Sequence, residues 1–406
     1  MPRQLLLAAA PLRPRPGEGW HRIKERAARR LAPLRRLAER VAGLRLAPLY
    51  AAAALHGEAS REQVEKLRSA LPPAVGIVSW GAGLRGEQME DVARQIGLER
   101  LRASSRLSGR GVTVAVLDSG IDLRHPWLEV AESVSTCPEP CEVAGRHGTF
   151  CAGVIASRHV EFPGIAPEAR LLNVKISRAD GLTSPAALAR GIDEALDRHA
   201  DVLSLSVGLN HFPGTGLERH GWSCSRGQCL LCRAVDTASL CGALVVAAAG
   251  NEHLQARALR RSAPQSHLDT ELLCPAQARG AITVGAIAKE PTEALYSASS
   301  RGPTSYGLDK PELLAPGVDV TSTIPAPAGE STLFNSFGVA SGTSVAAAVV
   351  AGAVALLIER RRATDRPWSP QEIRGELLAQ CTRPLSGPSF PCGPARTLDL
   401  ASLDLL

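Results

Sequence analysis

Between residues 111 and 287 the chain alternates short apolar runs with segments that read as helices. The apolar runs lie at 112–117, 169–176, 202–207, 243–249 and 281–287. The helical segments lie between them at 148–157, 185–199 and 234–241. Strands that alternate with helices form parallel sheets, and strands buried on both faces read as continuous apolar runs. We therefore expect an α/β fold, a doubly wound, mainly parallel sheet flanked by helices.

The C-terminal part contains two further predicted helices. An Ala/Val-rich run at 345–358 follows a glycine- and serine-rich turn and predicts a buried helix. It is shorter than the roughly 18 apolar residues that span a bilayer, so we expect no transmembrane segment. Ser369-Pro370-Gln371-Glu372 is a capping box with proline at the first helical position, and it predicts a helix at 371–381.

The first 95 residues form an N-terminal helical and α+β extension. We expect 1–47 to be a basic, partly helical arm in which the Pro/Arg-rich residues 1–19 are disordered. From Trp20 to Leu44, apolar residues recur with three/four spacing, which predicts a helix that Pro33 kinks or divides. Its apolar face is expected to dock on the protein, and a membrane-surface helix is the alternative.

Residues 48–95 are predicted to form a small α/β segment, with a helix at 61–71 and a strand at 75–80. Residues 96–406 would then form the main domain. Two inserts, 209–233 and 252–273, interrupt its alternating pattern. Because both inserts leave the carboxyl ends of predicted strands, both could border a ligand site.

Composition narrows the possible partners. Hydrophobic residues make up 45% of the chain and aromatic residues only 3%, so the core is built from Ala, Val, Leu and Ile. The net charge is +6, but residues 1–50 contain twelve Lys and Arg against three Glu, which leaves the remainder at about −3. Basic patches with interleaved aromatic residues are absent, so no nucleic-acid partner is expected. The basic helix could instead contact a partner protein or an anionic membrane surface.

The cellular compartment stays open. Ten cysteines suit a disulfide set in a secreted or periplasmic protein. The apolar patch Leu5–Ala10 is shorter than the 7–15 residues usual in a signal peptide, which favours a cytoplasmic protein.

Four polar residues stand at the ends of apolar elements. Asp118 ends the strand at 112–117, His147 opens the following helix, Asn251 follows the strand at 243–249, and Ser344 precedes the buried helix. A carboxylate can orient an imidazole, and the imidazole can take a proton from a serine hydroxyl. An amide can stabilise an oxyanion. Taken singly, each residue also has a structural interpretation as a turn or capping residue.

In their order and their flanking sequence, these residues resemble the subtilisin-like serine peptidase family. The resemblance spans about residues 96–400 and implies the subtilisin-like fold. Its matching segments are Ala115–Asp122, His147–Thr149, Gly164–Pro167, Leu205–Gly208, Ala248–Asn251, Ser299–Pro303, Lys310–Glu312, Ala315–Gly317 and Ser341–Ser344.

The resemblance implies a role for each of the four residues. Ser344 would attack the scissile carbonyl, and His147 would act first as general base and then as general acid. Asp118 would hold the tautomer of His147. Asn251 would form the oxyanion hole together with the backbone N–H of Ser344.

The resemblance also implies where substrate binds. Ser206-Val207-Gly208 and the neighbourhood of Gly181-Leu182 would pair with the substrate as added strands. Ala248-Ala249-Gly250 and Leu273 would also contact the substrate. The segment Leu272-Leu273-Cys274-Pro275 matches a region that lines the primary pocket in the family, and its two leucines suggest a preference for small or medium apolar side chains.

The sequence departs from the family pattern in three places. Phe150 follows the His-Gly-Thr segment where relatives usually carry histidine, and Val345–Val349 replaces the usual Met-Ala-Ala-Pro-His. The segment 157–163 lacks the Asn-rich loop that binds calcium in many relatives. No cofactor is therefore required, and a calcium site at this loop is expected to be missing.

The cysteines allow two interpretations. Disulfides that rigidify the rims of the site are the first, and they would involve Cys137, Cys141, Cys224, Cys229, Cys232 and Cys274, with a Cys381–Cys392 pair in the tail. The alternative is a structural zinc site formed by Cys224, Cys229, Cys232 and Cys274. Cys151 and Cys241 lie in predicted helices and are expected to be free buried thiols.

The function predicted is that of a serine endopeptidase acting on protein or peptide substrates. A dedicated maturation or regulatory peptidase with one partner protein is an alternative, and a catalytically silent peptide-binding scaffold is another. Residues 48–92 lie where family precursors carry an inhibitory prodomain. We therefore expect a zymogen that is cut within 85–108, the alternative being an extension that is never removed.

Overall fold

The structure, a computed structural model, divides the chain into two compact units. One unit consists of Met1–Arg85 with Ala326–Phe337, and the other of Gly86–Pro325 with Gly338–Leu406. The residues described are 3–8, 20–45, 47–49, 54–70, 76–80, 87–181, 183–209, 224, 227, 229–262, 270–289, 293–325, 336–364, 368–385 and 396–405.

The N-terminal unit has the element order β-α-β-β-α-β. Its elements are β1 (Arg3–Ala8), α1 (Trp20–Ala42), β2 (Ala47–Leu49), β3 (Ala54–Ala59), α2 (Arg61–Ala70) and β4 (Gly76–Trp80). The four strands form an antiparallel sheet in the order β2-β3-β1-β4, which is a ferredoxin-like arrangement. Segments assigned from sequence to an arm and to a separate α/β segment thus share one sheet.

Strand β1 corrects the prediction that residues 1–19 are disordered. Its backbone pairs with β3 on one side and with β4 on the other, so it lies in the middle of the sheet. Residues 9–19 lie outside the described part of the chain. The Pro/Arg-rich composition of residues 1–19 suggested disorder. Strand β1 is ordered because its backbone hydrogen bonds go to strands about 50 and 70 residues away in the sequence, which local composition does not reveal.

Helix α1 begins at Trp20, as predicted, and continues through Pro33, so the prediction that this proline divides the helix is wrong. Leu31, Leu34 and Ala38 are buried on one side of the helix. The helix packs against α2 and β3 of its own unit. At the start of α2, Gln63 donates a side-chain hydrogen bond to the carbonyl oxygen of Ala42 at 2.9 Å, which links the two helices.

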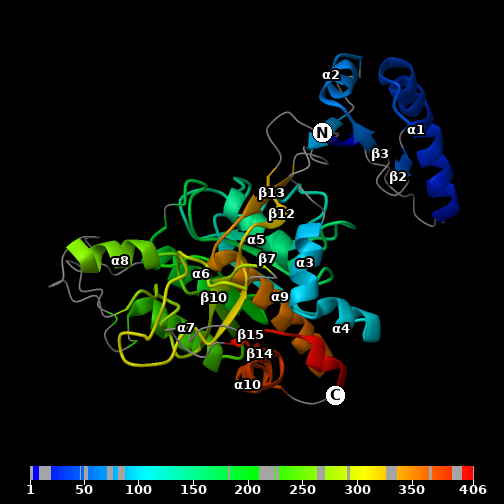
Figure 1. The fold of residues 1–406 in the computed structure, drawn as a ribbon. Helices are drawn as coiled ribbons and strands as arrows, with labels where there is room; N and C mark the ends of the chain where they lie inside the picture. Colours follow the sequence, from blue (N-terminus) through cyan, green and yellow to red (C-terminus); the bar gives the residue numbers. More distant parts are fainter. Residues whose placement is uncertain are drawn as a thin grey trace. The chain divides into compact units, whose positions relative to one another are not determined.

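The second unit is built around a nine-stranded sheet (Figure 1). The strand order is β14-β15-β11-β10-β9-β8-β5-β7-β6, and every described neighbouring pair is parallel except β14 with β15. The strands are β5 (Thr113–Asp118), β6 (Val130–Ser135), β7 (Arg170–Lys175), β8 (Val202–Leu205), β9 (Leu244–Ala248), β10 (Ala281–Ile287), β11 (Leu313–Pro316), β14 (Thr382–Pro384) and β15 (Arg396–Leu398). The mainly parallel sheet is therefore confirmed.

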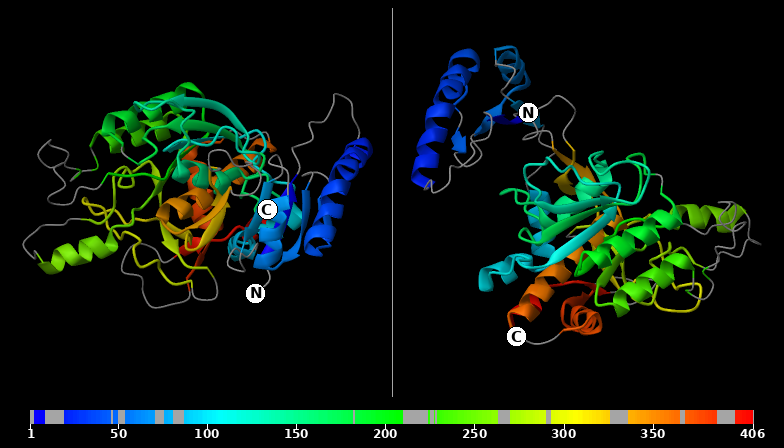
Figure 2. Two further views of the ribbon diagram at one scale, coloured as in Figure 1. Left: turned by 90° about the horizontal axis from the view of Figure 1, so that it is seen from above. Right: turned by 180° about the vertical axis from the view of Figure 1, so that it is seen from behind.

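Helices cover both faces of this sheet (Figure 2). Helices α5 (Arg146–Ala156) and α9 (Thr343–Arg362) lie on one face, and α6 (Pro185–Asp197) and α7 (Leu230–Leu240) lie on the other. Strand β5 shows the alternation: Val114 and Val116 belong to the α5/α9 core, whereas Leu117 belongs to the α6/α7 core. Burial on both faces explains why the strands read as continuous apolar runs.

Helix α9 passes through the centre of the unit. Among the described residues it is the one helix that is long and apolar enough to cross a membrane, and 89% of its apolar window is buried within the protein. It is therefore the core helix predicted from the run at 345–358. Its burial against α5 and the central strands fixes the position of its first turn, where Ser344 lies.

The remaining elements surround this core. They are α3 (Glu87–Gln95), α4 (Leu98–Ser104), α8 (His253–Ser262), β12 (Val320–Thr323), β13 (Phe337–Ala340), α10 (Pro370–Gln380) and η2 (Ala401–Leu405). Helix α10 has the predicted capping box, formed by Ser369 and Glu372. Helix α7 begins four residues before its predicted start, because the sulfur of Cys229 accepts a hydrogen bond from the backbone of Cys232 and caps the helix there.

Candidate active site

Asp118 is the last residue of β5, at the point where the strand order of the sheet reverses. The chain leaves β5 for β6 and β7 on one side and returns to β8 on the other. Ligand sites of doubly wound sheets form at such points, outside the carboxyl ends of the strands. The Asp118 side chain is 2% exposed, and its Oδ1 accepts a hydrogen bond from the backbone N–H of Ser119 at 2.6 Å.

His147 lies in the first turn of α5 and contacts Asp118 directly. Its Nδ1 lies 2.8 Å from each carboxylate oxygen, while 47% of the side chain stays exposed. A Cβ added at Gly148 would lie 2.5 Å from the carbonyl oxygen of Gly120, so this glycine allows α5 to approach the loop after β5. The negative charge of Asp118 raises the pKa of His147 above its usual value near 6.5, against the opposing effect of burial.

The side chains of Ser344 and Asn251 both lie next to Gly342. Ser344 is 8% exposed, and a Cβ added at Gly342 would lie 3.3 Å from its Oγ and 3.3 Å from Asn251 Nδ2. Thr343 orients the amide, since its backbone N–H donates to Asn251 Oδ1 at 3.0 Å and its Oγ1 lies 3.3 Å from the same oxygen. With Oδ1 engaged in this way, Nδ2 is the atom that can donate to a ligand.

Ser206 contacts one of these pairs, and Cys151 lies beside the other. Ser206 Oγ donates to the carbonyl oxygen of Ser344 at 3.1 Å. The sulfur of Cys151, the carboxylate of Asp118 and the ring of His147 have ligand atoms within 4.8 Å of one another. Among the described residues no hydrogen bond joins His147 to Ser344 Oγ, and catalytic hydrogen bonds are often long until substrate binds.

Leu273 lies between two of the segments predicted to bind substrate. A Cβ added at Gly208 would lie 2.7 Å from Leu273 Cβ, and one added at Gly250 would lie 2.6 Å from Leu273 Cγ. The backbone N–H of Leu273 donates to the carbonyl oxygen of Ala249 at 3.1 Å. Both glycines are therefore needed to leave room for this leucine, which is half-buried at the position predicted for the primary pocket.

The other residues predicted to bind substrate differ in how far they are exposed to solvent. Val207 is half-buried beside Gly208, whereas Ala248 is buried within β9. Gly181 lies in an exposed turn between the bridged residues Ser177 and Thr183, with a left-handed φ of 88°. No hydrogen bond links this turn to 206–208 in the described part of the chain, and Leu182 lies outside it.

Sequence reasoning missed Lys175, the last residue of β7. It is in register with Asp118, and its side chain is fully buried. Its Nζ donates to the carbonyl oxygen of Ser119 at 2.5 Å and lies 3.1 Å from a carboxylate oxygen of Glu139. A lysine that ends a buried apolar strand was the available signal, because a buried ammonium needs partners.

Two further sequence predictions concern cysteines. Cys151 is buried, as predicted, but Cys241 is exposed at the end of α7, so the prediction that it is buried is wrong. Helix α7 ends there, and the residue after its last turn faces outward. The predicted Cys381–Cys392 pair cannot be assessed, because Cys392 lies outside the described residues.

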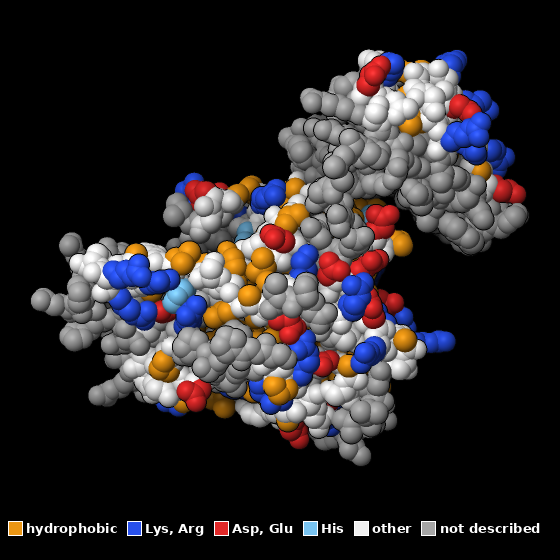
Figure 3. Space-filling model, in the orientation of Figure 1, with side chains coloured by type: hydrophobic (Ala, Val, Ile, Leu, Met, Phe, Trp, Pro, Cys, Tyr) orange, Lys and Arg blue, Asp and Glu red, His pale blue; other side chains and the backbone are white. Residues whose placement is uncertain are grey.

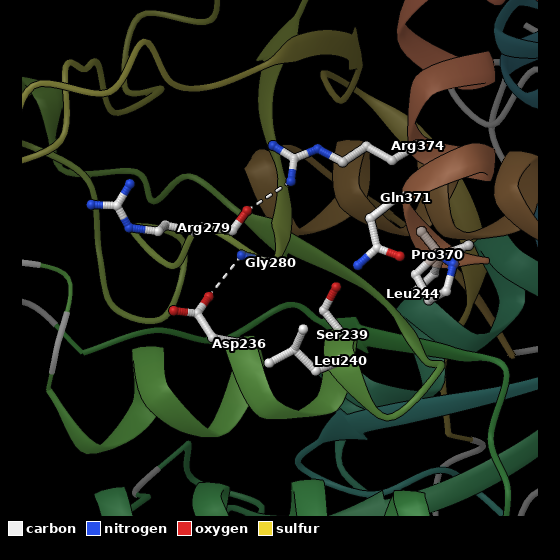
Figure 4. Close-up of a pocket in the computed structure, with 9 residues that line it drawn as sticks. All are labelled: Asp236, Ser239, Leu240, Leu244, Arg279, Gly280, Pro370, Gln371 and Arg374. Atoms are coloured by element: carbon white, nitrogen blue, oxygen red, sulfur yellow. Dashed lines mark hydrogen bonds between the residues drawn. The ribbon is translucent and has the colours of Figure 1, made fainter.

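A separate pocket lies at the amino ends of β9 and β10 (Figure 4). It is lined by Asp236, Ser239, Leu240, Leu244, Arg279, Gly280, Pro370, Gln371 and Arg374. Asp236 accepts from the backbone of Gly280, and Arg374 donates to the carbonyl of Arg279, each at 2.7 Å. Leu244 begins β9, whereas Asn251 follows its end, so this pocket is distinct from the site around Ser344.

Comparisons with known proteins agree with this arrangement. The chain matches the sequence model of the Subtilase family over residues 109–393. It is 33% identical over 311 residues to Serine protease AprX of Bacillus subtilis (strain 168), a match that covers 70% of this chain and 64% of AprX. It is 30% identical over 295 residues to Subtilisin of Bacillus pumilus, which covers 70% of this chain and 90% of that protein.

A solved structure shows the same fold. The crystal structure of a cold adapted subtilisin-like serine proteinase superposes with a TM-score of 0.54 at 20% sequence identity. The superposition covers 73% of this chain and 90% of that protein. The subtilisin-like α/β fold predicted from the sequence is therefore confirmed.

Proposed function

This chain belongs to the subtilase family of serine peptidases, and on that premise we propose that it hydrolyses peptide bonds through an acyl-enzyme. The observation that carries the proposal is the contact of His147 with Asp118, together with the meeting of Ser344 and Asn251 at Gly342. Ser206 donates to the carbonyl oxygen of Ser344, and Cys151 lies beside Asp118 and His147. No metal or organic cofactor is required for this chemistry.

In the proposed mechanism Ser344 Oγ attacks the scissile carbonyl carbon while His147 takes the hydroxyl proton. His147 then gives this proton to the leaving amine as the C–N bond breaks, which leaves an ester on Ser344. Water attacks the ester with the same imidazole as base, and the acid product and free serine are released. Asp118 keeps Nδ1 protonated and stabilises the imidazolium that forms in each step.

We assign the oxyanion hole to Asn251 Nδ2 and the backbone N–H of Ser344. The negative charge that develops on the substrate oxygen would be stabilised by these two donors. The hydrogen bonds from Thr343 to Asn251 Oδ1 support this assignment, because they fix the amide before substrate arrives. The first turn of α9 adds a favourable dipole at the same place.

Substrate binding is proposed to use main-chain pairing, with 206–208 on one side and the turn at Gly181 on the other. The primary pocket would lie beside 248–250, and Leu273 would limit its depth. Small or medium apolar side chains should therefore be preferred next to the cleaved bond. Cleavage of a mixed peptide library, read by mass spectrometry, tests this preference.

A narrower function, as a maturation peptidase for one partner protein, is favoured by helix α8. This helix lies in the second insert, immediately after Asn251, and carries exposed Arg257, Arg260 and Arg261. Figure 3 shows Lys and Arg side chains gathered over this helix. Such a basic surface near the site would attract an acidic partner. A broad cleavage profile on unrelated peptides would exclude this narrower function.

A fluorophosphonate probe tests the proposed activity. Folded and processed protein should acquire one adduct, and peptide mapping should place it on Ser344. Ser344→Ala should acquire none. Ser341→Ala is the matched control, since this exposed serine is three residues away, bonds to Asp319 and should leave labelling unchanged. A folded, processed protein without an adduct on Ser344 would instead support the catalytically silent scaffold.

A further inference from the structure

Four cysteine side chains, none of them among the proposed catalytic residues, converge inside the second unit. Cys224, Cys229 and Cys232 come from the end of the first insert and the start of α7, and Cys274 comes from the segment before β10. All four are buried, and their sulfur atoms lie within 4.8 Å of one another. Residues separated by up to 50 positions therefore contribute to one compact sulfur cluster.

The distances between the sulfurs match a tetrahedral metal site. Cys232 Sγ lies 3.4 Å from Cys224 Sγ and 3.6 Å from Cys274 Sγ. Four thiolates bound to zinc at about 2.3 Å would lie about 3.8 Å apart. A disulfide would bring each sulfur to about 2.05 Å from a single partner. Cys232 has instead two sulfur neighbours at similar distances, as the ligands of a common ion do.

Local structure already holds these sulfurs in place. The backbone N–H of Cys232 donates to Cys229 Sγ at 3.5 Å, and Gln277 Nε2 donates to Cys274 Sγ at 3.6 Å. Gly227 adopts a left-handed φ of 66° and closes a turn onto the carbonyl of Cys224 at 3.0 Å. N–H donors of this kind orient metal-bound thiolates and offset part of their charge.

We propose that Cys224, Cys229, Cys232 and Cys274 bind one structural zinc ion. On binding, the four thiols release their protons to solvent, and four Zn–S bonds form. The cluster provides four protein ligands and no open position, so the ion would be structural and not catalytic. Of the two sequence interpretations of these cysteines, the proposal adopts zinc.

The ion would brace one wall of the substrate site, and this consequence alone depends on the proposed function. Cys274 follows Leu273, and its backbone forms an antiparallel bridge with Leu209, with N···O distances of 2.8 and 3.0 Å. Leu209 in turn follows the segment 206–208. Zinc would therefore tie the first insert and α7 to the residue that limits the proposed pocket.

Metal analysis of the full chain tests the zinc site. Protein produced with added zinc should contain one zinc per chain, and a Ser344→Ala background prevents self-digestion. Co²⁺ put in place of zinc should give the charge-transfer absorption of a tetrahedral tetrathiolate site. Cys232→Ala should lose the metal, whereas Cys274→His should retain it through a new nitrogen ligand. Cys241 is exposed and outside the cluster, so Cys241→Ala is the control and should retain the metal.

Alkylation and peptide mapping of the chain with all its native cysteines, in the same Ser344→Ala background, supply a second measurement that needs no cysteine variant to fold. The four cysteines should resist alkylation in the folded protein. They should react once a chelator and a denaturant are both present. Disulfides among the four, or free thiols without zinc after zinc supplementation, would overturn the proposal. Zinc content does not depend on activity, so a failure of Ser344 labelling and a failure of zinc binding are told apart.

Discussion

The contact between His147 and Asp118 sets an expected pH dependence. The imidazole can act as a base only when neutral, and the carboxylate raises its pKa above 6.5. The acid limb of kcat/KM should therefore have its midpoint above about pH 6.5. Asp118→Asn removes the charge, so the limb should move to lower pH while kcat falls by about 10⁴-fold. Initial rates on a peptide substrate between pH 5 and pH 10 measure both effects.

The same contact affects stability in the opposite direction. Because the folded pKa of His147 is raised, the ion pair contributes stability that is fully present below about pH 6.5 and is lost as pH rises through the folded pKa. Activity and this contribution to stability therefore change in opposite directions with pH.

Glu142→Gln is the control for the pH dependence of activity. Glu142 is exposed in the loop before His147, so its substitution should leave the acid limb of kcat/KM in place. An unshifted limb in Asp118→Asn would contradict the assignment.

Asn251 should affect the chemical step more than substrate binding. The proposed oxyanion hydrogen bond strengthens in the transition state, so Asn251→Ala should lower kcat by about 10²–10³-fold with little change in KM. Thr343→Val should have a smaller effect, because the backbone N–H of Thr343 still holds Asn251 Oδ1. Thr343→Ser keeps the hydroxyl and should restore kcat. A raised KM with unchanged kcat in Asn251→Ala would argue against the oxyanion role.

Single residues differ in how well the sequence predicts them. Asp118, His147, Asn251 and Ser344 could be picked out because each ends or begins an apolar element within a recognisable segment. Thr343 gave no signal of its own as a positioning residue, since its partner Asn251 is 92 residues away. Contacts of this kind are decided by the packing of whole elements, and local sequence carries little information about them.

Among the elements, burial determines what could be predicted. The central strands are covered on both faces, so β5 and β9 read as apolar runs and were found near their true bounds. Strand β1 lies in a small sheet whose strands pair over long separations, and its composition gave no comparable signal. Helix α1 was found because its apolar face is continuous, even though it contains Pro33.

Two glycines in helices should respond oppositely to the same substitution. A Cβ at Gly352 in α9 would lie 2.6 Å from Cβ of Ile165, while one at Gly375 in α10 has nothing within 4 Å. Alanine raises helix propensity by about 1 kcal/mol, but overpacking a core costs about 1–3 kcal/mol. Gly352→Ala should therefore lower the free energy of unfolding by up to about 2 kcal/mol, and Gly375→Ala should raise it by up to about 1 kcal/mol.

Denaturant unfolding of both variants in a Ser344→Ala background measures this pair. The two substitutions add the same methyl group to helical backbone, so each serves as the control for the other. Equal shifts of the two midpoints would mean that α9 has room against Ile165, contrary to the close packing of α5, α9 and the segment at 164–166.

For the whole molecule, the two units have different architectures and different charge. The N-terminal unit has an antiparallel sheet with two helices, and the excess of nine positive charges in residues 1–50 falls within it. The second unit contains Asp118, His147, Asn251 and Ser344 and a complete two-sided core. Because the proposed catalytic residues all lie in the second unit, the chain can lose residues 1–85 without losing any of them.

We therefore expect residues 1–85, which make up the N-terminal unit apart from 326–337, to act as a removable prodomain. The cut should fall within 85–108 and near its beginning, because Met89, Val92 and Ile96 are buried in the core of the second unit and must stay. Full-length protein should cut itself there and gain activity, while Ser344→Ala should remain intact; mass spectrometry of the mature N-terminus measures the position. Fully active protein that retains residues 1–85 would show instead that the unit is a permanent domain, and its ferredoxin-like sheet would then need another role.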